Sequence, residues 1–236
     1  MKKVTRSILQ ELNNLSLNKD RESLIATTGQ NLIESTVNLF QKISEHYSDE
    51  EAFDNGEYYC GDIALQEKLA MGDKHSGFPE EHWAQPINNM LKIDPEIWTD
   101  FREKVKFEFA KEIGAHSSAL LNYYPTGGFV GWHTNWNANA YQVLFTYSAT
   151  GDSYFRYYDL ESSSIVTIPE KKGWQCRHYY FGRQDEPEHH CWHSAYSGCE
   201  RITLAYKFCN DSLMNIEKDK QARQMRDWAI EEITEN

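Results

Sequence analysis

No apolar segment of the sequence approaches the ~18 consecutive residues that a membrane-spanning helix needs, so a helical membrane protein is not expected. The first residues lead into polar sequence without the hydrophobic stretch of a secretory signal, which predicts a cytoplasmic protein. Basic residues are also few, because 24 Lys and Arg stand against 36 Asp and Glu, for a formal net charge of −12. Nonspecific binding to a phosphate backbone depends on clustered Lys and Arg. The composition therefore argues against a nucleic-acid partner.

Cysteine is scarce, and its count of five is odd. Without a secretory signal, these residues predict free thiols in a reducing compartment and not a disulfide framework. Aromatic residues, in contrast, are abundant, with 14 Tyr, 7 Trp and 11 Phe in 236 residues. Such a content favours β-sheet over a helix bundle. The 40% of hydrophobic and 25% of charged residues indicate an ordinary globular core.

Charge is distributed unevenly along the chain. Residues 115–208 hold 8 acids and 7 bases, whereas the remainder holds 28 acids and 17 bases. The near-neutral middle also contains most of the Tyr and Trp, which predicts a β-rich core between charged helices. We therefore expect a single domain over residues 1–236, with a mostly helical flank over 1–114, a core over 115–210 and a C-terminal helix over 211–236.

The strongest helix pattern covers residues 95–113. Asp94 is suited to the N-cap, Pro95 to the first helical position, and Gly114 to the stop. Helical spacing gives one apolar face, formed by Trp98, Phe101, Val105 and Phe109. Further helices are expected over 31–45 and 216–233, and one or two short strands within 1–18 and 47–95.

The pattern changes after Gly114, where short segments rich in Tyr, Phe, Val, Thr and Ile alternate with Gly and Pro turn signals. Seven such segments predict strands over 119–124, 130–135, 141–147, 154–158, 165–168, 178–181 and 201–208. Strands at this spacing favour a sandwich or a jelly-roll barrel. The expected fold class is α+β, mainly β, with flanking helices.

Two short segments contain candidate metal ligands, since neutral imidazole is the commonest nitrogen ligand in proteins. His133 and Asn135 share one side if both lie on a strand, although a His beside Trp132 is more often a hydrogen-bonded core residue. The second group is residues 189–193, which contain three histidines. His189 and His190 fit an exposed loop, whereas His193 precedes a strongly β segment.

A zinc site offers an alternative use of the second histidine group, with sulfur ligands from Cys191, Cys199 or Cys209. Their spacing lacks the paired short Cys loops of structural zinc sites, so the signal is weak.

Arg201 and Thr203 share one face of the last predicted strand, opposite the apolar Ile202 and Leu204. An Arg on the inner face of a small barrel is costly unless it meets an anion. That anion is either the carboxylate of a structural ion pair or the carboxylate of a ligand held in a bidentate grip.

Taken in order, Asn122-Tyr123-Tyr124-Pro125-Thr126-Gly127, His133 and Asn135, His193, and Arg201-Ile202-Thr203 resemble the iron(II)- and 2-oxoglutarate-dependent dioxygenases. The likeness is greatest to the branch that includes prolyl hydroxylases and nucleic-acid alkyl demethylases. The family pattern is Asn-x-Tyr, a Gly turn, His-x-Asp, a distal His and Arg-x-Ser/Thr, and the resemblance covers about residues 119–208. The family fold, a double-stranded β-helix or jelly roll, agrees with the strands expected above.

The resemblance implies the roles of the site residues. His133, Asn135 and His193 correspond to the ligands of Fe(II), while Arg201 and Thr203 correspond to the residues that bind the distal carboxylate of 2-oxoglutarate. Asn122 and Tyr124 correspond to further hydrogen-bonding residues for this cosubstrate. In the family, decarboxylation of the cosubstrate produces the oxidant that removes hydrogen from a substrate C–H bond, and the protein supplies aim and excludes water.

The sequence departs from the family at Asn135, where the family has Asp. An amide oxygen is a weaker ligand than a carboxylate for a hard dication. Three explanations remain open: Asn135 still coordinates, a halide or water fills the position as in the related halogenases, or the site is inactive.

The sequence thus predicts a jelly-roll oxygenase that hydroxylates a protein side chain or a small metabolite. The alternatives are a catalytically inactive binding or assembly module and a zinc-binding protein.

Overall fold

The computed structural model describes residues 56–61, 79, 81–86, 94–110, 115, 117–135, 141–159, 162–181 and 190–208. The helices predicted over 31–45 and 216–233, and the strands predicted within 1–18, lie outside the described residues. Within them, no helix is long and apolar enough to cross a bilayer.

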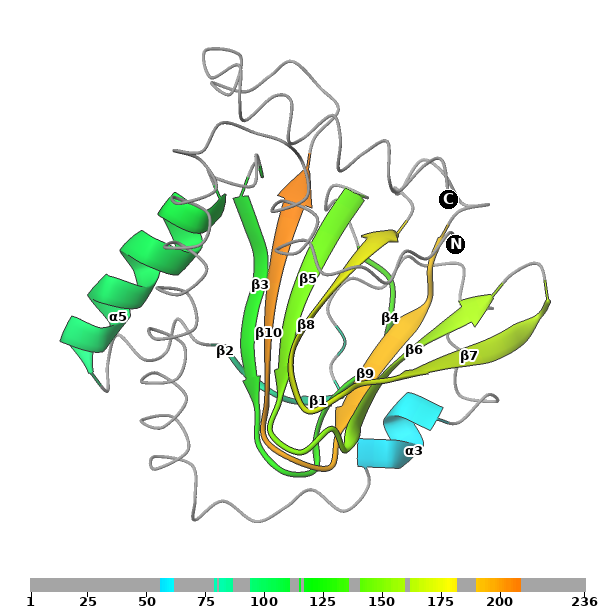
Figure 1. The fold of residues 1–236 in the computed structure, drawn as a ribbon. Helices are drawn as coiled ribbons and strands as arrows, with labels where there is room; N and C mark the ends of the chain where they lie inside the picture. The colour runs from blue at the N-terminus through cyan, green and yellow to red at the C-terminus, as the bar shows by residue number, and fades with distance from the viewer. Residues whose placement is uncertain are drawn as a thin grey trace.

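Two antiparallel five-stranded sheets dominate the described part of the chain (Figure 1). The first has the order β2-β3-β10-β5-β8, and the second has the order β1-β4-β9-β6-β7. The strands of the first sheet are β2 (Gln85–Pro86), β3 (Ser117–Tyr124), β10 (Arg201–Phe208), β5 (Tyr141–Ser148) and β8 (Gly173–Tyr180). Those of the second are β1 (His82–Trp83), β4 (Gly128–His133), β9 (His193–Ser197), β6 (Ser153–Asp159) and β7 (Ser164–Pro169). The chain passes repeatedly between the sheets, and the result is a β-rich sandwich.

The outer face of the first sheet packs on a long helical segment, visible beside β3 in Figure 1. This segment begins as α5 (Pro95–Phe101) and continues as the π-helix η2 (Arg102–Phe109). Phe109 meets Phe145 of β5 and Tyr206 of β10 edge-on, with ring centroids 5.0 and 5.4 Å apart. The Tyr206 hydroxyl donates a 2.8 Å hydrogen bond to the Val105 carbonyl. The sheet therefore buries an apolar face on its outside, against the helix.

A short helix, α3 (Gly56–Gly61), covers the outer face of the second sheet beside β4 and β9. Tyr59 stacks on Phe129 of β4 at 5.5 Å. The Cys60 carbonyl accepts a 2.9 Å hydrogen bond from Ser194 of β9. Gly56 permits the close approach, because a Cβ there would lie 2.8 Å from both the Gly127 carbonyl oxygen and the Phe129 ring. Each sheet thus packs a helix on the outer face of some of its strands, and the two inner faces lie opposite each other.

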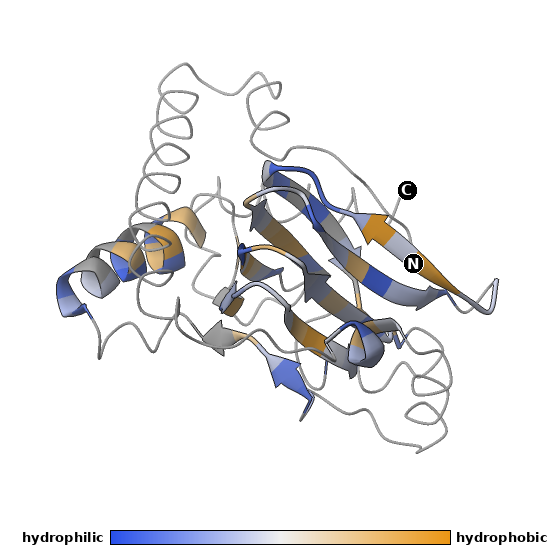
Figure 2. Ribbon diagram, turned by 90° about the horizontal axis from the view of Figure 1, so that it is seen from below, coloured by the Kyte–Doolittle hydropathy of each residue, from blue (hydrophilic) through white to orange (hydrophobic). Residues whose placement is uncertain are grey.

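The inner face of the first sheet is unusually polar. Directly paired residues of neighbouring strands share a face, and the pairs Arg201–Tyr124, Thr203–Asn122, Thr203–Thr146, Leu144–Arg177 and Gln142–Tyr179 lie on the face opposite the helix. Figure 2 shows hydrophobic and hydrophilic segments following one another along the strands. The alternation is that of a half-buried strand, but here the polar set faces the second sheet.

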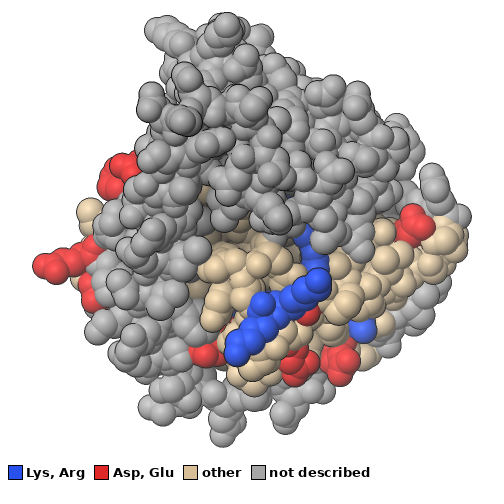
Figure 3. Space-filling model, in the orientation of Figure 1, with Lys and Arg blue, Asp and Glu red and all other residues tan. Residues whose placement is uncertain are grey.

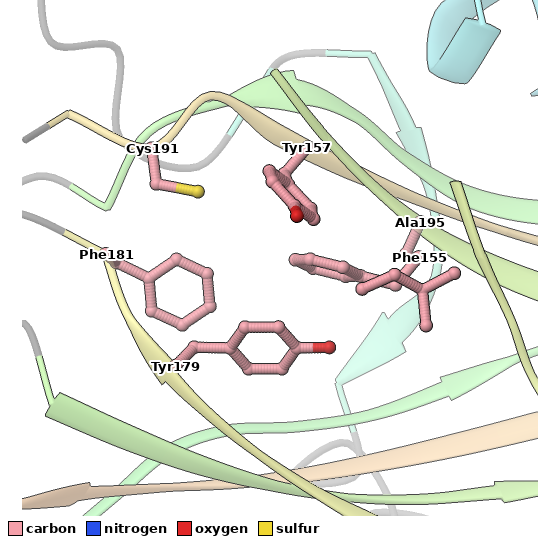
Figure 4. Close-up of a cluster of buried hydrophobic side chains, with 7 residues drawn as sticks. Phe155, Tyr157, Tyr179, Phe181, Cys191 and Ala195 are labelled. Atoms are coloured by element: carbon pink, nitrogen blue, oxygen red, sulfur yellow. The ribbon is translucent and has the colours of Figure 1, made fainter. Parts of the chain in front are cut away.

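An apolar cluster fills part of the space between the sheets (Figure 4). Phe155 of β6 lies 4.8 Å from Tyr179 of β8 between ring centroids, and Tyr179 lies 5.3 Å from Phe181. Tyr157, Ile168, Cys191 and Ala195 complete the cluster. This contact shows that the face carrying Tyr179 and Arg177 points inward.

Several sequence-based expectations are confirmed. The helix begins at Pro95, two short strands lie within 47–95, and the last strand spans residues 201–208 as expected. Cys60, Cys191 and Cys199 are free thiols.

Other expectations need correction. Strand β8 begins at Gly173 and not at residue 178, while β9 and α3 were not expected. Strand β4 ends at His133, so Asn135 lies beyond the strand and not on it.

The packing of β5 against η2 predicts a large stability loss for Phe145→Ala. Phe145 is buried between Phe109 and Tyr206, and truncation of such a ring costs about 3–5 kcal/mol. Phe107→Ala is the matched control, because Phe107 is 45% exposed on the same helix and its loss should change stability by no more than about 0.5 kcal/mol. Urea unfolding measures both variants, and equal effects would contradict this packing.

Candidate functional site

His133 and His193 lie side by side on neighbouring strands. The last residue of β4 pairs directly with the first residue of β9, and the two imidazole centroids are 4.1 Å apart. Both side chains are buried. Two residues 60 positions apart in sequence are thus brought to one point, as the resemblance implied.

Backbone carbonyls orient both rings. His133 Nδ1 lies 2.8 Å from the Gly131 oxygen, and His193 Nδ1 lies 2.9 Å from the Cys191 oxygen. A carbonyl oxygen can only accept, so each Nδ1 carries the proton, and a neutral ring then has its lone pair on Nε2. Such a carbonyl partner is the usual support of a histidine that ligates a metal through its other nitrogen.

His133 is neutral at physiological pH. Burial lowers the pKa of His133 from 6.5 to about 4, and this effect outweighs the hydrogen bonds to the backbone of Gly131 and His193, which favour the charged form. Neutral imidazole is the form that binds metals.

Aromatic rings surround His193 on its inner side. The Phe181 and Phe155 centroids lie 4.5 and 5.6 Å from the His193 ring. The histidine pair therefore borders the apolar cluster of Figure 4, which includes both phenylalanines.

Asn135, the third predicted ligand, follows β4 by two residues and is partly buried. Between them, Thr134 is fully buried. Among the described residues, no group of three His, Cys, Asp or Glu side chains is placed to hold a metal ion. The candidate donors that the structure brings together are therefore the two imidazoles of His133 and His193.

Arg201 forms a buried ion pair at another part of the interior. Its Nε and Nη2 donate to the two carboxylate oxygens of Glu170 at 2.9 and 2.7 Å, and its Nη1 donates to Thr203 Oγ1 at 2.6 Å. Its Cζ lies 4.6 Å from the ring centroid of Tyr124. Arg201 is 1% exposed. The sequence left two possible anionic partners for Arg201, a protein carboxylate and a ligand carboxylate. The structure contains the first, which is Glu170.

Glu170 is the acidic partner that the sequence reading missed. Burial raises its pKa, but the charge of Arg201 and hydrogen bonds from Arg201 and Ser153 outweigh burial, so the pKa lies below its ordinary value and Glu170 is ionised. Ser153 Oγ donates to it at 2.7 Å. Because Glu170 follows Pro169 and precedes two lysines, local sequence indicates only a turn.

Asn122 and Tyr124 lie next to this pair on β3, directly opposite Thr203 and Arg201. The structure therefore gathers the four residues predicted to bind the cosubstrate. Asn122 is 2% exposed, and its Nδ2 has no hydrogen-bond partner. A buried donor without a partner indicates a missing acceptor, which fits a bound oxygen ligand. The predicted roles of these residues remain predictions.

The two described cysteines of the zinc alternative, Cys191 and Cys199, lie in different surroundings. Cys191 belongs to the apolar cluster, whereas Cys199 Sγ contacts Ser148 Oγ at 3.3 Å. Burial raises the pKa of Cys191 to about 12, so its thiol stays protonated. Cys209, His189 and the side chain of Cys176 lie outside the described set.

The described surface carries mixed charge. On the face seen in Figure 3, a short strip of Lys and Arg is bordered by Asp and Glu.

Comparisons with known proteins identify no family for this chain, so its function has to be argued from its own residues. No known family and no curated protein matches the sequence. Among solved structures, the chain is similar to a prolyl-4-hydroxylase from Pseudomonas putida, with 11% identity over 72% of this chain and 98% of that one, and a TM-score of 0.30.

The neutral state of buried His133 predicts a pH-dependent stability of the metal-free protein. The unfolded chain binds a proton on this ring below pH 6.5, but the folded protein does so only near pH 4. Stability should therefore fall by about 3 kcal/mol as pH decreases from 6.5 to 4. Urea unfolding across this range measures the slope. His133→Gln should remove this contribution, whereas His82→Gln, at an exposed site, should leave it; equal slopes for parent and His133→Gln would contradict the assignment.

Proposed function

We propose that the chain is a jelly-roll oxygenase that depends on Fe(II) and 2-oxoglutarate. The observation that carries the proposal is the pair of buried imidazoles, His133 and His193, each held by a carbonyl at Nδ1. The passage of successive strands from one sheet to the other supports a jelly-roll arrangement. A bound iron would supply the activation of O₂, and a 2-oxo acid would supply two electrons.

The protein residues have separate tasks in this proposal. His133 and His193 bind the metal through Nε2, with Asn135 or solvent at a third position. Asn122 donates a hydrogen bond to the cosubstrate, because its buried Nδ2 has no partner. The cluster of Phe155, Tyr179 and Phe181 excludes water beside the histidines. The primary substrate is a protein side chain or a small metabolite.

A catalytically inactive binding or assembly module is the second candidate. The Arg201–Glu170 pair favours it, because the arginine expected to hold a cosubstrate already has a carboxylate partner. The absence of a carboxylate at position 135 favours it as well. This candidate predicts neither metal binding at the histidine pair nor consumption of 2-oxoglutarate.

Mn(II) titration, followed by the electron paramagnetic resonance signal of the free ion, tests the metal site. His193→Ala should weaken Mn(II) binding at least about tenfold, because one of two nitrogen ligands is lost. His82→Ala is the control, since His82 is exposed on β1. Succinate release from 2-oxoglutarate with Fe(II) then tests the activity. Unchanged Mn(II) affinity in His193→Ala would place any metal elsewhere, and one equivalent of tightly held zinc would favour the zinc alternative.

Asn135→Asp tests the third ligand position. If residue 135 coordinates, a carboxylate oxygen should raise Mn(II) affinity, since it suits a hard dication better than an amide does. The gain should grow as pH rises through the carboxylate pKa, because only the ionised form binds. Asn135→Leu, of similar size and without charge, should give no gain. The same affinity for parent and Asn135→Asp at every pH would show that residue 135 is not a ligand.

A further inference from the structure

Two buried arginines and one buried glutamate occupy the space between the sheets. Among the described residues, the buried side chains with a permanent charge are Glu170, Arg177 and Arg201. The charges of these three side chains sum to +1. An uncompensated buried charge is costly, so one more anion would stabilise this interior.

Arg201 has no need of that anion. Both carboxylate oxygens of Glu170 are bound by its guanidinium, and its remaining Nη1 reaches Thr203. Glu170 is in turn engaged by Ser153. The pair is complete in both charge and geometry.

Arg177 is in the opposite situation. It lies on β8, pairs with Leu144 of β5 and is 7% exposed. Its Nη2 donates to neutral acceptors, the Pro169 carbonyl at 2.9 Å and Gln175 Oε1 at 3.1 Å, and its side chain also hydrogen-bonds the Tyr179 hydroxyl. Its Nε is buried and has no hydrogen-bond partner. Arg177 is close enough to Glu170 to act on it electrostatically, but the carboxylate of Glu170 is already bound by Arg201.

We infer that Arg177, and not Arg201, is the residue that binds the carboxylate of a ligand between the sheets, while Arg201 and Glu170 form a structural pair beside it. The inference rests on the proposed function only for the identity of the ligand, 2-oxoglutarate. The unpartnered Nε offers a charge-assisted hydrogen bond to a carboxylate oxygen, and the ligand charge neutralises the interior.

Asn122 adds a second unpartnered donor on the same inner face. Its strand, β3, is separated from β8 by β10 and β5, about 14 Å between the two strands at the usual spacing, and the register places Asn122 level with Gln175, two residues before Arg177. A ligand with acceptor groups at both ends serves these two donors better than a single small anion does. This favours a dicarboxylate.

Calorimetric titration of the full chain with glutarate, which lacks the reactive 2-oxo group, tests the anion site without metal chemistry. Arg177→Gln should weaken glutarate and 2-oxoglutarate binding about tenfold or more, the usual effect of losing a charge-assisted contact. Lys172→Gln removes the same charge from an exposed position near β8 and should leave the affinity unchanged. Equal affinity for parent and Arg177→Gln would overturn the inference, as would a parent that binds neither compound.

The double variant Glu170→Gln with Arg201→Gln separates the two arginines. It removes both charges of the pair together, so that neither Glu170 nor Arg201 is left without its partner. Glutarate affinity should be equal or higher, because Arg177 remains and the neighbouring negative charge is gone. A loss of tenfold or more in a double variant that melts cooperatively would assign the carboxylate to Arg201 and overturn the inference.

The parent protein provides a measurement that does not depend on a variant's folding. The Nε–H resonance of Arg177, assigned with Arg177→Lys, should shift and exchange more slowly with water when glutarate is added. No change at saturating glutarate would overturn the inference. Glutarate binding at Arg177 without any turnover of 2-oxoglutarate would support the anion site and contradict the oxygenase, so the two failures are distinguishable.

Discussion

The arrangement of the interior depends on one ion pair, between Arg201 at the start of β10 and Glu170 just after β7. It joins the two sheets, since β10 belongs to one and β7 to the other. Burying two charges costs several kcal/mol, and only bidentate geometry with further hydrogen bonds offsets it. Thr203 and Ser153 supply those hydrogen bonds. The pair therefore ties β10 to β6 and to the end of β7 at one end of the sandwich.

The polarity of the first sheet follows from a second constraint. Phe145 and Tyr206 direct the apolar face of this sheet onto the helical segment that contains Phe109, so the polar face has to turn inward. A sandwich that served only stability would place apolar side chains on both inner faces. Here apolar packing between the sheets is concentrated around Phe155 and Tyr179. The cost of the polar interior is understandable if it binds a ligand.

The sequence predicts those strands whose alternation has a period of two and ends at Gly or Pro, as residues 201–208 show. It places β8 too late because the inward residues of its first half, Gln175 and Arg177, are polar and look like those of an exposed turn. It misses β9, because Ser194 is a polar residue that is nevertheless buried, with its hydroxyl bonded to the Cys60 carbonyl of α3. Glu170 is unpredictable for a related reason, since its partner lies 31 residues away. A local sequence pattern shows only the periodicity of apolar residues, whereas these contacts depend on residues that are far apart in the sequence.

The interior has two chemically different ends, and their difference limits what it can bind. At one end, His133 and His193 are buried next to Phe155 and Phe181, where burial keeps His133 uncharged. At the other end, two guanidinium groups lie near one carboxylate, that of Glu170, and only Arg201 is hydrogen-bonded to it. A cation placed at the arginine end would meet repulsion, and a neutral ligand would leave the surplus charge in place. In the proposed function, a ligand with an anionic group at the arginines and oxygen atoms toward a metal held by the imidazoles would be complementary to both ends, which leaves it one favourable orientation.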